Sequence, residues 1–163
     1  LVRGGTGSRS EFEEQPSMLP DRYEAGTPNG VGLAGLIAAL QVVSARTVQS
    51  IRADELALLQ RLRAGLAAIP RVYVYGPRDP EKSTAVVSLR IEGMRPDEVG
   101  LALDEDFGIL TRVGLHCAPA AHRTVGTFPD GSVRLSLGYF TTADDIDRTV
   151  RAVSDIAARS GGS

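Results

Sequence analysis

The chain has 163 residues, a length that suits one domain or one compact domain with an added segment. Hydrophobic residues make up 42% and charged residues 23%, close to the composition of ordinary soluble globular proteins. A formal net charge of −2 gives no basic footprint for nucleic acid or for an anionic membrane surface, so we expect neither as a partner.

The single cysteine cannot form an internal disulfide. No secretory signal is visible, and together these features predict a reducing, cytoplasmic location. The chain starts at Leu1, and residues 1–5 read like the middle of a protein. We therefore expect a truncated or processed product.

The first third of the chain predicts an arm followed by helices. Residues 1–20 are rich in Gly, Ser, Glu and Pro without periodicity, which predicts a loop. The apolar run 31–43 predicts a helix that is covered on most sides. Residues 27–45 carry no charge, so a membrane-spanning helix is the alternative; Pro28, Gln41 and the lack of flanking cations weaken it.

A second helix is predicted from about residue 50 to residue 68, and Pro70 follows it. Asp54 and Glu55 lie near its positive end. One stripe carries its apolar residues, namely Ile51, Leu59, Leu62 and Leu66.

The rest of the chain predicts four strands and two further helices. Strands are expected at 72–75, 84–91, 109–113 and 133–139. One helix starts at Pro96 and ends near Asp106, and the other is capped by Thr142 with Asp145. The buried stripe of the last helix is Ile146, Val150, Val153 and Ala157. The order β-β-α-β-β-α predicts an α/β fold, a two-layer sandwich with helices on one side of a small sheet.

Cys117 is the first candidate functional residue. The stretch 111–119 leaves a strand, passes Gly114 and delivers His116 and Cys117 into a loop. A thiol attacks as its thiolate, which nearby cations favour, and Arg112 and His116 could supply that positive charge. The alternative is that a lone cysteine is a small buried hydrophobic residue.

Arg134 is the second candidate. Alternation over 133–139 places Arg134, Ser136 and Gly138 on the face opposite the apolar residues. A buried arginine without an anion is costly, and a ligand carboxylate matches its planar fork. A solvent-facing arginine on an open sheet is the alternative.

Two weaker features complete the candidates. The glycine-rich run 4–8 could cradle a phosphate, although taken alone it favours a flexible linker. His116, Cys117 and His122 could be offered as metal ligands, but their spacing fits no zinc pattern and we predict no metal.

Four segments, in order along the chain, resemble one known family. Residues 23–29 (Tyr-Glu-Ala-Gly-Thr-Pro-Asn), 112–118 (Arg-x-Gly-x-x-Cys-Ala), 133–136 (Val-Arg-x-Ser) and the helix from 142 to 150 resemble the cysteine desulfurase branch of the class V aminotransferases. These are pyridoxal 5'-phosphate (PLP) enzymes of fold type I. Residues 4–10 and 115–119 resemble the subgroup called cysteine desulfurase-like.

The resemblance implies the C-terminal portion of a homodimeric enzyme that removes sulfur from L-cysteine. Alanine and a persulfide on Cys117 would result, and a sulfur-acceptor protein could take the persulfide. A selenocysteine lyase acting on selenocysteine is equally compatible. By the same resemblance, Arg134 holds the substrate carboxylate, and Arg112, Asn29 and His116 lie near the substrate.

The resemblance also implies a division of the chain. Residues 1–20 would form a dimer arm in which Thr6 and Gly5 reach the PLP phosphate of the partner subunit. Residues 21–68 would be a helical segment joining from the large domain, and residues 69–159 the C-terminal small α/β domain.

The sequence departs from the family in its lysines. The cofactor-binding lysine of the family follows a histidine in the large domain, whereas the only lysine here, Lys82, matches nothing catalytic. We therefore expect the chain alone to be inactive. Two alternatives remain: a class V aminotransferase for another amino acid, and a non-catalytic domain that only binds a partner.

Overall fold

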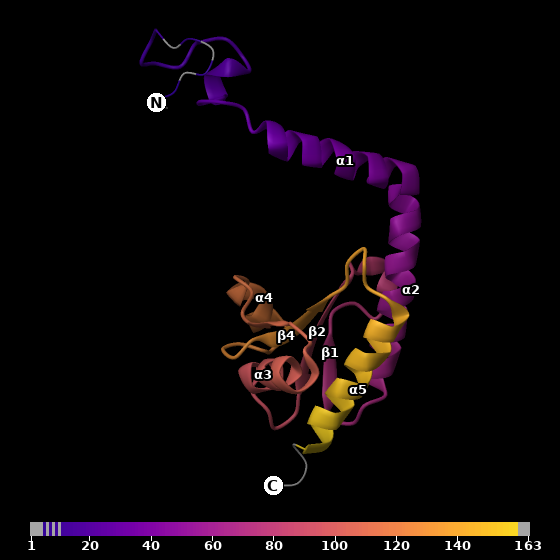
Figure 1. Ribbon diagram of the computed structural model, residues 1–163. Helices are drawn as coiled ribbons and strands as arrows, with labels where there is room; N and C mark the ends of the chain where they lie inside the picture. Colours follow the sequence, from indigo (N-terminus) through magenta and orange to yellow (C-terminus); the bar gives the residue numbers. More distant parts are fainter. Residues whose placement is uncertain (1–4, 6, 8, 10, 160–163) are drawn as a thin grey trace. The chain divides into compact units, whose positions relative to one another are not determined.

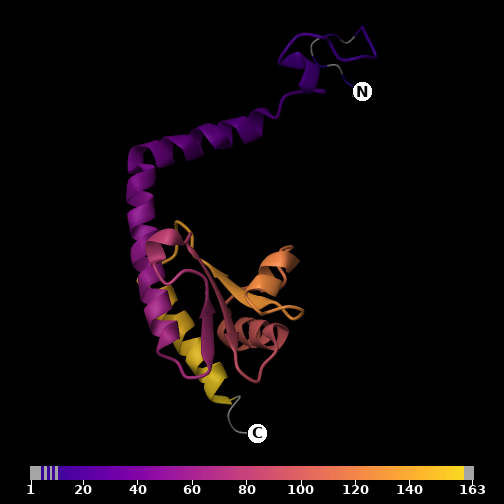
Figure 2. The same cartoon turned by 180° about the vertical axis from the view of Figure 1, so that it is seen from behind.

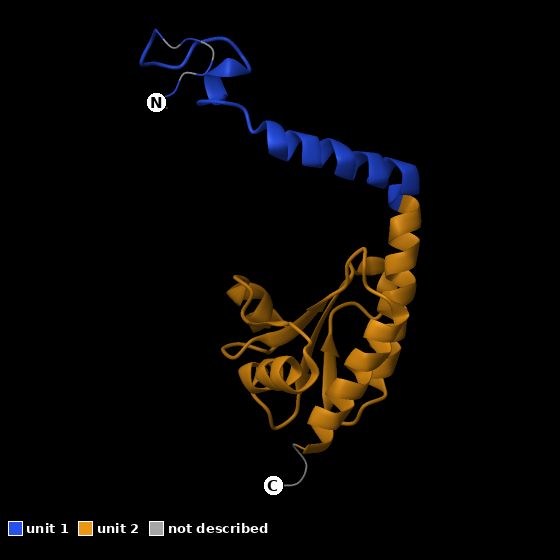
Figure 3. Cartoon of the chain, in the orientation of Figure 1, with its two compact units in different colours: residues 1–48 blue, residues 49–163 orange. Residues whose placement is uncertain are grey.

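The structure is a computed structural model that describes residues 5, 7, 9 and 11–159. It divides into two compact units, residues 1–48 and residues 49–163 (Figure 3). The sequence analysis instead divides the chain after residue 20 and after residue 68. The difference arises because the apolar stripe of the second helix packs into the core of the second unit.

The first unit contains the 3-10 helix η1 (Asp21–Tyr23) and helix α1 (Gly30–Arg46). Asn29 caps α1, since its side-chain oxygen accepts a hydrogen bond from the Gly32 amide at 2.9 Å. The predicted helix is present, but the expectation that it is covered on most sides is wrong. None of its residues is buried, and Val31 is 88% exposed.

Among the described residues, no single helix is long and apolar enough to cross a membrane. Helix α1 and the next helix, α2 (Val48–Ala67), reach the required length and apolar composition only when they are counted together as one broken pair.

The second unit is built on a four-stranded antiparallel sheet with the order β1-β2-β4-β3 (Figure 1). The strands are β1 (Val72–Tyr75), β2 (Val86–Ile91), β3 (Arg112–Gly114) and β4 (Ser132–Ser136). The predicted β1 has the observed bounds. The predicted β2 and β4 run two or three residues too long, and β3 is shifted toward Gly114.

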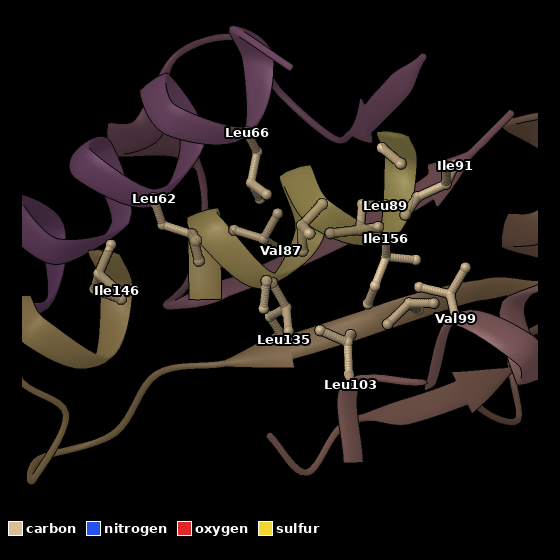
Figure 4. Packing of buried hydrophobic residues seen from close by; sticks show 14 of the residues in the cluster. Leu62, Leu66, Val87, Leu89, Ile91, Val99, Leu103, Leu135, Ile146 and Ile156 are labelled. Atoms are coloured by element: carbon tan, nitrogen blue, oxygen red, sulfur yellow. The ribbon is translucent and has the colours of Figure 1, made fainter. Parts of the chain in front are cut away.

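Three helices pack on one face of this sheet: α2 (Val48–Ala67), α3 (Pro96–Phe107) and α5 (Ala143–Arg159). Alternate residues of β2 and β4 point into the same layer and complete the core (Figure 4). The fully or almost fully buried members are Leu59, Leu62, Leu66, Val87, Leu89, Ile91, Val99, Leu103, Val133, Val153 and Ile156. Burial of each such side chain contributes on the order of 1.5–3 kcal/mol, so this layer holds the unit together.

The expected α/β sandwich is therefore confirmed, with one element that the sequence analysis lacks. Helix α4 (Pro119–Thr124) lies on the other side of the sheet from α2 and α5, as both views show (Figures 1 and 2). The short 3-10 helix η2 (Pro80–Lys82) joins β1 to β2. The predicted cap of α5 is present: Thr142 Oγ1 accepts from the Asp145 amide, and Asp145 Oδ2 accepts from the Thr142 amide.

Gly131 is a position where the fold admits no side chain. Its φ is +83°, and an added Cβ would collide with the carbonyl of Gly114 at the neighbouring end of β3. We expect Gly131→Ala to lower the free energy of unfolding by at least about 2 kcal/mol, measured by urea denaturation. The matched control is Gly126→Ala, at φ +76° with nothing within 4 Å, which should lose only about 1 kcal/mol. Equal losses would contradict the collision.

Candidate functional site

Cys117 lies in a tight turn between β3 and α4. His116 and Cys117 have φ values of 50° and 59°, a left-handed conformation that costs about 1–2 kcal/mol per residue. The turn is closed by a hydrogen bond from the Ala118 amide to the Leu115 carbonyl at 2.8 Å, and Pro119 then starts α4. Two successive strained residues hold the thiol at the surface, where Cys117 is exposed.

Arg112 is the partner of this thiol. One of its terminal nitrogens lies 3.8 Å from Cys117 Sγ. A guanidinium at this distance offers a charge-assisted contact to a thiolate. The exposure and the contact both disagree with the alternative that Cys117 is a buried hydrophobic residue.

His116 folds back on the same strand. Its Nε2 lies 3.1 Å from the Arg112 carbonyl oxygen, and because a carbonyl only accepts, Nε2 must carry the proton. The pKa of His116 is lowered, chiefly by burial, although the hydrogen bond to the Arg112 carbonyl raises it and the charge of Arg134 lowers it again. The ring is therefore neutral at pH 7, so Arg112, and not His116, supplies the positive charge expected beside Cys117.

This lowered pKa predicts a pH dependence of stability. The unfolded chain binds a proton at His116 more readily than the folded chain does. The free energy of unfolding therefore keeps its full value above the ordinary histidine pKa and decreases as the pH falls below it. We expect the free energy of unfolding to decrease between about pH 7 and about pH 5. Urea denaturation at each pH measures this decrease. His116→Gln should remove this part of the dependence. An unchanged profile in the variant would contradict the assignment.

Arg134 lies on β4 directly opposite Arg112 of β3 and Ser88 of β2. Directly paired residues share a face of the sheet, so two guanidinium groups emerge side by side. Arg134 is half-buried, and its Nε is buried without a hydrogen-bond partner among the described residues. Two adjacent cations, one with an unpaired donor, are suited to an anion with two oxygens, such as a carboxylate.

His122 and Thr127 form a hydrogen-bonded pair near the turn, and the sequence analysis does not predict this pair. His122 is 7% exposed, its ring centroid lies 5.7 Å from that of His116, and its Nδ1 lies 2.6 Å from Thr127 Oγ1. Their separation of five residues along the chain is the sequence signal that links them. In the part of the chain that the structure describes, no group of three His, Cys, Asp or Glu side chains could hold a metal ion.

The structure brings Cys117, Arg112, His116 and Arg134 together within the second unit. Asn29 and Gly5 belong to the first unit, and Thr6 lies outside the described residues. The Gly5 carbonyl accepts hydrogen bonds from the Gly26 amide at 2.5 Å and from Gln15 Nε2 at 3.3 Å. Asn29 acts as a helix cap, so the side chain already has a structural role.

The described residues of the first unit do not by themselves fit the phosphate of PLP. A Cβ on Gly7 would approach the Gly26 carbonyl oxygen to 2.7 Å, so this glycine is needed for chain packing. The neighbouring pocket of about 660 Å³ contains Asp21 and Glu24 and no cation among its described lining residues. Lys82, the only lysine, ends η2 in the second unit. The described residues thus do not complete a PLP site.

The sequence model of the family described as aminotransferase class-V matches residues 2–149. The chain belongs to the class-V aminotransferase family. Similar class-V proteins include "Probable cysteine desulfurase 2" of Mycobacterium leprae, 34% identical over 134 residues, which are 82% of this chain and 31% of the relative. A cysteine desulfurase of Dickeya dadantii is 36% identical over 137 residues, 84% of this chain and 32% of the relative.

Solved structures of class-V proteins give the same result for the fold. The apo cysteine desulfurase of Thermococcus onnurineus NA1 has a TM-score of 0.81 at 29% identity, covering 98% of this chain and 39% of that one. The cysteine desulfurase CsdA of Escherichia coli (S-sulfonic acid) has a TM-score of 0.78 at 26% identity, covering 97% and 38%. The expected PLP fold type I is confirmed, and the chain spans about a third of the length of the two curated relatives.

Proposed function

We propose that this chain carries the sulfur-accepting cysteine and the substrate-binding arginine of a PLP-dependent cysteine desulfurase. One observation supports this most directly: the exposed Cys117 thiol contacts Arg112, and Arg112 lies directly opposite Arg134, whose Nε is unpaired. The named activity of the similar proteins from Mycobacterium leprae and Dickeya dadantii agrees with it.

Each side chain has a part in this proposal. Arg134 binds the carboxylate of L-cysteine through its planar fork. The Cys117 thiolate forms an S–S bond to the substrate sulfur, the C–S bond of the substrate breaks, and its electron pair stays on carbon, which takes a proton to give alanine. Arg112 stabilises the sulfur anion of the resulting persulfide. His116, neutral at pH 7, holds the turn through the Arg112 carbonyl.

The cofactor and the partners are also part of the proposal. PLP is the cofactor of the family, and we propose that its lysine comes from residues outside this sequence, because Lys82 is the only lysine here. "Full-length protein" below means this chain together with the residues that supply that lysine. A homodimer, a cytoplasmic location and a protein that accepts the sulfur are proposed from the family resemblance, and the exposure of Cys117 suits such an acceptor. Selenocysteine is the alternative substrate.

The reactivity of the Cys117 thiol can be tested on the 163-residue chain alone. We expect iodoacetamide to label Cys117 in the folded chain, because the thiol is exposed and contacts a guanidinium. Arg112→Gln should slow labelling at pH 7 severalfold, since it removes that charge; Arg123→Gln, which changes an exposed arginine of α4 stacked over Phe128, should not. Labelling only after denaturation would contradict a surface thiol.

A further inference from the structure

Helix α4 begins two residues after Cys117, so the placement of this helix determines where the thiol lies. The turn before it contains two successive left-handed residues, His116 and Cys117. Such a conformation persists only where tertiary contacts hold the chain on both sides. On one side, β3 is held by its pairing with β4. On the other side lies α4, whose six residues are too few for a helix that is stable by itself.

A buried pair of polar side chains holds the end of α4. His122 lies on the last turn of the helix and is 7% exposed, and Thr127 in the following loop is 1% exposed. His122 Nδ1 and Thr127 Oγ1 are 2.6 Å apart, which is a short hydrogen bond. The His122 carbonyl also accepts from the Thr127 amide at 2.9 Å and from the Phe128 amide at 3.2 Å. Side chains and backbone together therefore join α4 to the loop that follows it.

The loop that carries Thr127 is in turn attached to β3. The Thr127 carbonyl accepts from the Gly131 amide at 2.7 Å. Gly131 packs so closely on Gly114 of β3 that it admits no side chain. A continuous path of contacts therefore runs from α4 through this loop to β3, the strand that precedes the turn.

The pair also lies next to the turn itself. The ring centroid of His122 is 5.7 Å from that of His116, whose Nε2 donates to the Arg112 carbonyl. A shift of α4 would displace the Cys117 turn and change the 3.8 Å separation between Cys117 Sγ and the Arg112 guanidinium. A hydrogen bond between two buried groups resists such a shift, because breaking it leaves both groups without a partner.

We propose that the buried His122–Thr127 pair positions the Cys117 thiol: it holds α4, and through α4 the turn, at the distance from which Arg112 contacts the sulfur. His122 and Thr127 are positioning residues, which act on the thiol through the helix. The positioning can be tested on the 163-residue chain, whereas its consequence for the reaction rests on the proposed function.

Alkylation of Cys117 by iodoacetamide at pH 7 measures the positioning without any turnover. Thr127→Val replaces the hydroxyl by a methyl group, and we expect it to slow labelling about threefold to tenfold, because the thiol loses its fixed place beside the guanidinium. Thr127→Ser keeps the hydroxyl and loses a buried methyl, so it should lower the Tm and yet label at the parental rate. Slower labelling of Thr127→Ser than of Thr127→Val, or equal labelling of both variants and the parent, would overturn the proposal.

Further variants separate positioning from a general loss of structure. His122→Leu removes the same hydrogen bond from the other side and should slow labelling by a similar factor. In an Arg112→Gln background, Thr127→Val should slow labelling no further, since the contact through which the pair acts is already gone. Thr124→Val makes the same replacement at an exposed position of α4 and should label as the parent does. Additive effects of Arg112→Gln and Thr127→Val, or slow labelling of Thr124→Val, would contradict positioning through the Arg112 contact.

In the full-length protein, Thr127→Val should lower the kcat for alanine release from L-cysteine about tenfold and leave the KM within about twofold. The KM is spared because Arg134 is held by strand pairing on both sides. A raised KM with the parental kcat would count against the proposal.

Cys117→Ala distinguishes a failure of this proposal from a failure of the proposed function. If Cys117→Ala keeps the parental release of sulfide, the desulfurase proposal fails, while the labelling rates of the 163-residue chain still decide the positioning. If Cys117→Ala loses the release but Thr127→Val keeps the parental kcat, only the positioning proposal fails.

Discussion

Replacing Cys117 with alanine is expected to reduce the release of sulfide and alanine from L-cysteine by the full-length protein on the order of 10³-fold or more. Cys117 is the only cysteine in this sequence, and its thiol is the proposed nucleophile toward the substrate sulfur. The measurement is the rate of alanine and sulfide formation in the presence of a reducing thiol.

The control is Thr124→Ala on α4, since the Thr124 hydroxyl donates to the Ala120 carbonyl of its own helix. This variant should keep the parent rate. Undiminished release of sulfide by Cys117→Ala would remove the desulfurase proposal and favour a class V aminotransferase for another amino acid, in which Cys117 is incidental.

The second large effect is expected at Arg134. Arg134→Met should raise the KM for L-cysteine about 10- to 100-fold, because the variant loses a bidentate, charge-assisted contact to the carboxylate. Arg134→Lys should recover only part of the loss, since an ammonium lacks the planar fork. The free energy of unfolding should hardly change, because the buried Nε has no partner to lose.

The matched control is Arg90→Met on β2, whose guanidinium pairs with Asp130 at 3.3 Å. It removes a positive charge of the same sheet and should leave the KM as it is. A KM of Arg134→Met equal to that of the parent, or full recovery by Arg134→Lys, would contradict a bidentate carboxylate site.

The secondary structure was largely predictable where one periodicity dominates. The stripes of α2 and α5 point to the observed core, because three or four apolar residues at helical spacing leave only one face to bury. The exposure of α1 was not predictable, since a helix with apolar residues on all sides does not indicate which segment, if any, covers it. Helix α4 has six residues, too few for any periodicity to show.

The candidate site was predictable to a similar degree. Alternation along β4 gives the face of Arg134. The position of Arg112 beside it was not predicted, because it depends on the pairing of β3 with β4. The charge state of His116 was not predictable, since it depends on burial and on a backbone carbonyl. The pairing of His122 with Thr127 depends on how a loop closes, which sequence spacing alone does not determine.

Mass spectrometry of the peptide that contains Cys117 tests the proposed sulfur transfer most directly. The full-length protein is mixed with L-cysteine, then trapped with an alkylating reagent and digested without reductant. We predict one additional sulfur atom on Cys117 in the parent protein, and a strongly reduced yield in Arg134→Met at low L-cysteine. Release of alanine with no added sulfur on Cys117 would contradict its role as the sulfur acceptor.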